Sequence, residues 1–138
     1  MRRREVRILG FSIKEASERL GLAAHTIRYY EKEGLLPFIQ RDQHRNRIFE
    51  QRDLDWINLM TCFRMTGMTV TALKQIVDLA LQGDSTIPQR KAILEAHKLE
   101  LTRRQVELDR AFDAVNQKLS TYELLEKESM KSDYPNRK

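Results

Sequence analysis

An apolar residue recurs every seven positions through the last third of the chain, at Leu94, Leu101, Leu108, Val115 and Tyr122. A seven-residue apolar repeat is typical of a helix that packs lengthwise against a second helix. The repeat predicts one helix over residues 87–125, which is too long to be covered by the small domain in front of it. We therefore expect a partner helix. The alternative is a lone helix folded over its own domain.

Length and composition limit what precedes this helix. The 138 residues amount to about one domain, and the low counts of 5 Gly and 3 Pro favour a helical, soluble protein. No apolar run is long enough to span a membrane. Cys62 is the one cysteine, so an intrachain disulfide is excluded and a reducing cytoplasm is the expected location. Four of the five net positive charges fall within residues 1–50, which indicates a polyanionic partner at that end.

The first third of the chain predicts two short helices in close succession. Ser12 and Glu15 have the spacing of a capping box, and Gly21 ends the helix that they begin. A second helix is expected over residues 24–33. Two short helices joined by a tight turn form a helix-turn-helix, although an ordinary hairpin of helices with a polar face has the same pattern. Side chains suited to phosphates and base edges lie on or beside the outer face of the second helix, namely His25, Thr26, Arg28 and Tyr29.

A basic hairpin is expected next. Residues 38–41 and 47–49 are predicted to be extended, and a polar turn joins them. Such a ribbon after a helix-turn-helix is a wing, and it carries Arg41, Arg45 and Arg47. Two further helices are predicted over residues 52–65 and 70–81. The expected organisation is a basic arm (1–11), either frayed or touching phosphate, a winged domain (12–82, wing about 38–49), a dimerisation helix (87–125) and a flexible tail (126–138).

The run from Thr26 to Glu31, read Thr-Ile-Arg-Tyr-Tyr-Glu and followed by Gly34-Leu35 and Pro37, resembles the DNA-binding core of MerR-family transcription regulators. This resemblance implies a mainly α fold in which a winged helix-turn-helix precedes a long dimerisation helix that forms an antiparallel coiled coil. It implies a homodimer that binds a palindrome in double-stranded promoter DNA and twists the spacer so that RNA polymerase can engage it. The implied DNA contacts are His25, Thr26, Arg28, Tyr29, Arg41 and Arg47, and the seven-residue repeat is the implied dimer seam. The sequence departs from the family at the wing tip, which lacks glycine, and at Ala23, which stands where a capping Ser or Thr is usual.

A finer resemblance concerns Cys62. Trp56-Ile57, Cys62, Gly67 and the block from Gly83 to Arg90 are similar to the NmlR/AdhR-like subgroup, which implies that Cys62 senses reactive aldehydes or related electrophiles. On a helical projection Cys62 lies about 120° from the apolar stripe of its helix. No cationic residue lies four positions away from Cys62, where it could stabilise a thiolate. The alternative is a buried, inert cysteine.

Other kinds of chemistry find no support in the sequence. Residues 111–138 contain no Cys or His, and the three histidines are scattered, so neither a metal site nor a cofactor is expected. An enzyme using Cys62 as nucleophile lacks a glycine-rich phosphate loop and a histidine at recognisable spacing. We therefore expect no enzymatic activity. Three alternatives stay open: a regulator that senses a non-thiol ligand, a ligand-independent architectural DNA-binding protein, and a coiled-coil adaptor without nucleic acid.

Overall fold

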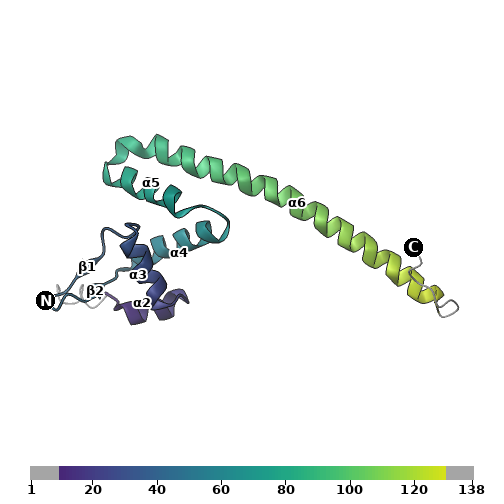
Figure 1. Ribbon diagram of the computed structural model, residues 1–138, viewed down its shortest axis with the longest axis horizontal. Coiled ribbons are helices and arrows are strands. Elements are labelled where there is room, and N and C mark those ends of the chain that lie inside the picture. Colours follow the sequence, from purple (N-terminus) through teal and green to yellow (C-terminus); the bar gives the residue numbers. More distant parts are fainter. Residues whose placement is uncertain (1–9, 130–138) are drawn as a thin grey trace. The chain divides into compact units, whose positions relative to one another are not determined.

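The computed structural model describes residues 10–129 of the 138. Within that range it contains five α-helices, a short 3-10 helix and a two-stranded sheet (Figure 1), which confirms the mainly α, winged class. No helix in this part of the chain is long and apolar enough to cross a membrane. The chain divides into two units, Met1–Leu94 and Glu95–Lys138. Residues 1–9 of the predicted arm and residues 130–138 of the predicted tail lie outside the described range.

Helix α2, Ile13–Leu20, begins and ends as the sequence predicts. The Ser12 hydroxyl accepts a hydrogen bond from the Glu15 amide at 3.1 Å, and the Glu15 carboxylate accepts one from the Ser12 amide at 2.8 Å. Gly21 then takes a left-handed conformation with φ of 68°, which glycine adopts without steric cost. Local capping therefore fixes the position of this helix along the chain.

Helix α3, Ala24–Lys32, follows after a three-residue link. Ala23 precedes it without any side-chain cap, so packing must stabilise the helix instead. Ile27 and Tyr30 supply that packing, since both side chains are buried. Glu33 and Gly34 end the helix, one residue earlier than predicted, and Gly34 has φ of 83°.

The wing consists of β1, Gln40–Arg41, and β2, Arg47–Ile48, paired antiparallel with Arg41 opposite Arg47. The strands are shorter than predicted, because Pro37 and Phe38 form a turn. Beyond β2, Phe49 pairs with Phe11 through two backbone hydrogen bonds of 2.6 and 2.8 Å. The predicted arm of residues 1–11 therefore enters the folded domain at its end, where the Arg19 guanidinium also lies 4.4 Å from the Phe11 ring centroid.

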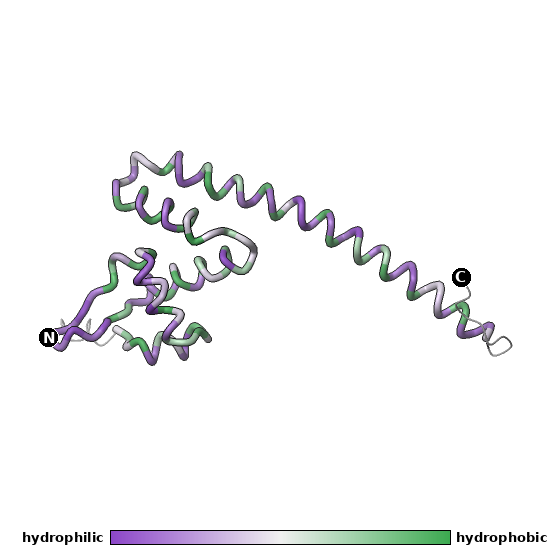
Figure 2. The backbone as a smooth tube through the Cα atoms, in the orientation of Figure 1, coloured by the Kyte–Doolittle hydropathy of each residue, from purple (hydrophilic) through white to green (hydrophobic). Residues whose placement is uncertain are grey.

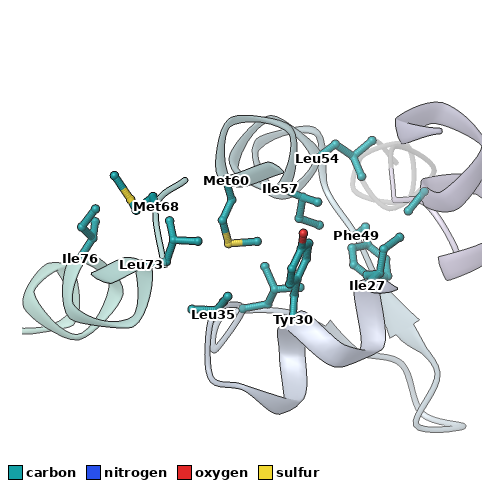
Figure 3. Close-up of a cluster of buried hydrophobic side chains, with 12 residues drawn as sticks. Ile27, Tyr30, Leu35, Phe49, Leu54, Ile57, Met60, Met68, Leu73 and Ile76 are labelled. Atoms are coloured by element: carbon teal, nitrogen blue, oxygen red, sulfur yellow. The ribbon is translucent and has the colours of Figure 1, made fainter. Parts of the chain in front are cut away.

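Helices α4, Gln51–Met65, and α5, Val70–Leu81, complete the winged unit. Helix α4 begins one residue before the predicted start, because Glu50 and Asp53 form a capping box. Figure 3 shows the buried side chains of α3, α4 and α5 meeting in one core, with Phe49 joining from the wing. The Trp56 indole N–H also donates to the Leu35 carbonyl at 3.0 Å, which ties α4 to the segment that leads into the wing. The core thus fixes α3 and the wing on the same scaffold.

A polar cluster joins α5 to α6. The 3-10 helix Asp84–Thr86 ends at Thr86, which is buried. The Thr86 hydroxyl lies 2.6 Å from the Leu79 carbonyl oxygen and 2.8 Å from that of Gly83. Arg90 donates from Nε to the same hydroxyl at 3.1 Å and from Nη2 to the Gly83 carbonyl at 3.0 Å. These bonds hold the first turn of α6, within the first unit, against the end of α5.

Helix α6 spans Ile87–Glu128. It ends three residues beyond the predicted end at 125, because residues 126–128 are Glu-Lys-Glu, good helix formers with no glycine or proline among them. No described residue of α6 is buried. Green, hydrophobic positions recur along its whole length in Figure 2. Four members of the predicted seam are 39% to 58% exposed, namely Leu94, Leu108, Val115 and Tyr122, while Leu101 is half-buried.

Candidate nucleic-acid interface

The outer face of α3 carries the polar side chains that the sequence predicts for DNA contact. His25, Arg28 and Tyr29 are exposed, and Thr26 is half-buried at the first turn. The Tyr29 ring lies 6.0 Å from the ring of the buried Tyr30, so the core limits where Tyr29 can move. One face of this short helix is therefore anchored and the opposite face is left free for a partner.

A basic hollow of about 520 Å³ lies between α2, α3 and the wing. It is lined by Lys14 of α2, Arg28 of α3 and the wing residues 41, 42 and 45–48, together with residues 10–13. Three of the predicted contacts, Arg28, Arg41 and Arg47, thus come together at one site. Their guanidinium groups suit phosphate, which accepts paired hydrogen bonds from arginine. His25, Thr26 and Tyr29 lie on α3 and do not line this hollow.

Glu31 does not line the hollow but pairs with two arginines that do, and the sequence does not identify it as a functional residue. Arg41 Nη2 lies 3.2 Å from both carboxylate oxygens of Glu31, and Arg47 Nε donates to Oε1 of the same carboxylate. The carboxylate therefore joins α3 to both strands of the wing. Glu31 is ten residues from Arg41 and sixteen from Arg47, so no helical or strand periodicity relates them.

The wing turn forms without glycine because Asp42 organises it. Asp42 Oδ1 accepts hydrogen bonds from the backbone amides of His44, at 2.8 Å, and Asn46, at 2.9 Å. These bonds lower the pKa of the Asp42 carboxyl below its ordinary value, with the backbone amide of Asn46 as the largest cause. The left-handed position that glycine usually fills is taken by Arg45, with φ of 66°. Arg41 Nη1 donates to the Arg45 carbonyl at 3.0 Å, which holds the tip in place.

Two arginines of the hollow differ from the pair bound to Glu31. Arg28 and Arg45 are exposed, and within residues 10–129 neither guanidinium has a hydrogen bond or ion pair. Arg45 was expected on the hairpin but was not among the predicted DNA contacts. Arg45 lies at the wing tip and its guanidinium has no partner among residues 10–129, so the structure makes it a candidate phosphate contact that the sequence does not identify.

Cys62 lies on the surface of α4 as a free, exposed thiol, as its place off the apolar stripe predicts. The two arginines nearest to it in sequence are engaged elsewhere. Arg52 pairs with Glu50 at 3.0 Å, and Arg64 donates to the Met68 carbonyl at 3.2 Å. Across the described part of the chain, no group of three or more His, Cys, Asp or Glu side chains is arranged to hold a metal ion.

Known proteins share this arrangement. Residues 11–80 match the family described as MerR HTH family regulatory protein. An uncharacterized HTH-type transcriptional regulator from Haemophilus influenzae is 35% identical over 113 residues, covering 82% of this chain and 84% of that protein. The HTH-type transcriptional regulator AdhR from Bacillus subtilis is 34% identical over 90 residues, covering 65% of this chain and 64% of AdhR. The crystal structure of HiNmlR, a MerR family regulator lacking the sensor domain and bound to promoter DNA, aligns with a TM-score of 0.77 at 34% identity, covering 85% and 93% of the two chains. The chain therefore belongs to the MerR family of helix-turn-helix transcriptional regulators, which are not enzymes.

Proposed function

We propose that this regulator binds double-stranded promoter DNA through the outer face of α3 and the basic hollow beside it. The observation that carries the proposal is the convergence of Arg28, Arg41, Arg45 and Arg47 on one hollow next to α3. The related HiNmlR, which was crystallised on promoter DNA, supports the same partner. The cytoplasm is then the expected location, since bacterial promoter DNA lies there.

In this proposal α3 acts as the recognition helix and enters the major groove, as the second helix of a helix-turn-helix does. His25, Thr26 and Tyr29 face base edges and sugar-phosphate, while the wing follows the neighbouring backbone. Binding distorts the spacer of the promoter, at a cost that depends on how easily its sequence deforms. RNA polymerase then engages the realigned promoter.

The proposal includes a homodimer formed through α6. The seam of Leu94, Leu101, Leu108, Val115 and Tyr122 supports it, because four of these side chains are exposed and Leu101 is half-buried, and a helix does not leave such an apolar row uncovered without a partner. Burial of each leucine contributes roughly 1.5–3 kcal/mol. Pairing with an antiparallel copy gives the twofold symmetry that a palindromic operator requires.

We assign sensing of reactive aldehydes or similar electrophiles to Cys62, as a response to electrophile stress. The exposed thiol on α4 and the relationship to AdhR and HiNmlR support this assignment. The sulfur adds to the aldehyde carbon, and the thiol proton passes to the carbonyl oxygen, which becomes a hydroxyl. The adduct enlarges a side chain on a helix of the scaffold that holds α3. Such a change can bias two arrangements of the dimer without altering its affinity for DNA.

The DNA-binding proposal is tested by Arg28→Ala, with Arg110→Ala, an exposed arginine on α6, as the control of equal charge. If Arg28 contacts phosphate, the slope of log affinity against log salt falls by about 0.9 per subunit. If Arg28 reads a guanine, the loss is instead confined to one base position and amounts to roughly 1–3 kcal/mol. Affinity equal to that of the Arg110→Ala control would remove Arg28 from the interface.

The sensing proposal is tested by Cys62→Ala. The variant is expected to retain the dimer and operator binding, but to lose both the aldehyde adduct in mass spectrometry and the induction of transcription. Full induction of the variant would reject the thiol mechanism. That result would favour a regulator that senses a non-thiol ligand. If no added compound changes transcription from the promoter, the protein is instead a ligand-independent architectural protein.

A further inference from the structure

Glu31 places a carboxylate within the basic surface that is proposed to face phosphate. Its oxygens accept hydrogen bonds from Arg41 at 3.2 Å and from Arg47, so this carboxylate connects α3 to both strands of the wing. The side chains of Glu31 and Arg47 are each only 21% exposed. An ion pair with this degree of burial and several hydrogen bonds is harder to exchange for a phosphate contact than an exposed pair.

The charge balance of this cluster differs from that of its neighbours. Two arginines share one carboxylate, so Glu31, Arg41 and Arg47 together carry a single positive charge. Arg28 and Arg45, by contrast, line the same hollow, and neither guanidinium has a partner among residues 10–129. Arg41 also reaches the backbone of Arg45 through the 3.0 Å bond to its carbonyl, so the Glu31 cluster extends to the wing tip.

We propose that Glu31 is a positioning residue that uses Arg41 and Arg47 to hold the wing against the recognition helix, leaving Arg28 and Arg45 as the phosphate contacts of this hollow. The inference rests on the proposed DNA binding and reassigns two of its predicted contacts. Arg41 and Arg47 act by positioning: they determine where Arg45 lies, and Glu31 balances half of their combined charge.

The test uses the full-length chain and a mixed-sequence DNA duplex, because the salt slope of non-specific binding counts phosphate contacts without knowledge of the operator. Arg45→Ala is expected to lower the slope by about 0.9 per subunit, the amount for one lost contact. Arg41→Ala is expected to weaken binding at every salt concentration while changing the slope by less than half of that amount. A full drop of about 0.9 for Arg41→Ala would show that it contacts phosphate directly and would overturn the proposal.

Removal of Glu31 provides the matching measurement. In Glu31→Gln both arginines lose their carboxylate, so the slope is expected to become steeper than in the wild type. In that background Arg41→Ala is now expected to lower the slope by about 0.9, since the freed guanidinium can reach phosphate. The proposal is contradicted if Glu31→Gln has the same salt slope as the wild type. It is also contradicted if Arg41→Ala changes the slope by the same amount with Glu31 present and with Glu31 replaced.

A readout in the free protein separates this inference from DNA binding itself. Glu31→Gln is expected to speed hydrogen exchange at the amides of the wing turn, residues 42–46, whereas Glu18→Gln, an exposed carboxylate on α2, is not. Equal exchange in the two variants rejects the positioning role of Glu31 even if DNA binding is intact. Absence of wild-type binding to the duplex at low salt rejects the proposed function. If Arg41→Ala fails to fold, Arg41→Gln replaces it, because glutamine retains a hydrogen-bonding side chain without charge.

Discussion

The Thr86 hydroxyl at the junction of α5 and α6 gives a prediction whose magnitude follows from its partners. Thr86→Val keeps the shape of the side chain and removes the hydroxyl, so little cavity is created. The hydroxyl has one proton, which it donates to the carbonyl of either Leu79 or Gly83, and it accepts from Arg90 Nε. Valine therefore removes one neutral hydrogen bond and one with a charged donor.

Neither carbonyl is left without a partner by this change. Leu79 still accepts from the Gln82 amide at 3.0 Å, and Gly83 still accepts from the Thr86 amide at 3.1 Å and from Arg90. The loss is thus the net value of the two bonds, about 1 kcal/mol for the neutral one and about 1.5 kcal/mol, the low end of the range, for the charged one, because Arg90 keeps its bond to the Gly83 carbonyl. We expect Thr86→Val to lower the free energy of unfolding by about 2.5 kcal/mol.

Urea denaturation followed by circular dichroism measures this change, with all variants at one protomer concentration because a dimer's stability depends on it. Thr86→Ser is the matched control: it retains the hydroxyl and loses one buried methyl group, at about 1 kcal/mol. Arg90→Ala completes a double-mutant cycle, and its effect is expected to shrink in the Thr86→Val background. A Thr86→Val protein within about 0.5 kcal/mol of the wild type would show that the cluster contributes no net stability and would refute this reasoning.

Three further predictions concern other elements. Leu101→Asp combined with Leu108→Asp is expected to give monomers or unfolded chain in sedimentation, and a stable dimer of this variant would show that the seam is misplaced. The lowered pKa of Asp42 implies that its stabilising contribution to the wing turn is complete above the unfolded pKa, 3.8, and is lost as the pH falls through the folded pKa. The protection of the turn amides, meaning the intrinsic exchange rate at each pH divided by the observed rate, should therefore fall with acidification in the wild type but not in Asp42→Asn. Gly34→Ala is expected to cost about 1 kcal/mol or more in thermal unfolding, because φ is 83°, a backbone conformation that is strained for any residue with a Cβ; the flexible Lys74 side chain can move away from the added methyl group. A variant as stable as the wild type would contradict that strain.

Local signals account for the parts of the fold that the sequence predicts well. The capping box at Ser12 and the glycine at 21 each act over three or four residues, and α2 lies where these signals place it. The apolar spacing of Ile27 and Tyr30 likewise identifies the buried face of α3, which leaves the opposite face for a partner. Such local contacts can be predicted from the sequence because the residues that make them are spaced by the period of the α-helix.

The features that sequence reasoning missed depend on contacts between distant segments. The pairing of Phe11 with Phe49 and the bonds of Glu31 to the wing form only after the core has brought those segments together. The turn at Asp42 has a local cause, but side-chain capture of two amides competes with several other turn types, and no glycine marks it. The end of α6 was placed too early because Glu126 and its neighbours are polar, and polarity does not stop a helix.

The conformation of Arg45 sets stability against function at a single residue. A side chain with φ of 66° pays a steric penalty on the order of 1 kcal/mol that glycine avoids. Arg45→Gly would therefore give a more stable wing, and a design guided by thermal stability alone would choose it. The same change would delete an unpaired guanidinium from the surface proposed to bind DNA. Selection for DNA affinity would then retain Arg45, although glycine at this position would give the protein a higher free energy of unfolding. The wing tip is the part of the fold where this loss of stability arises.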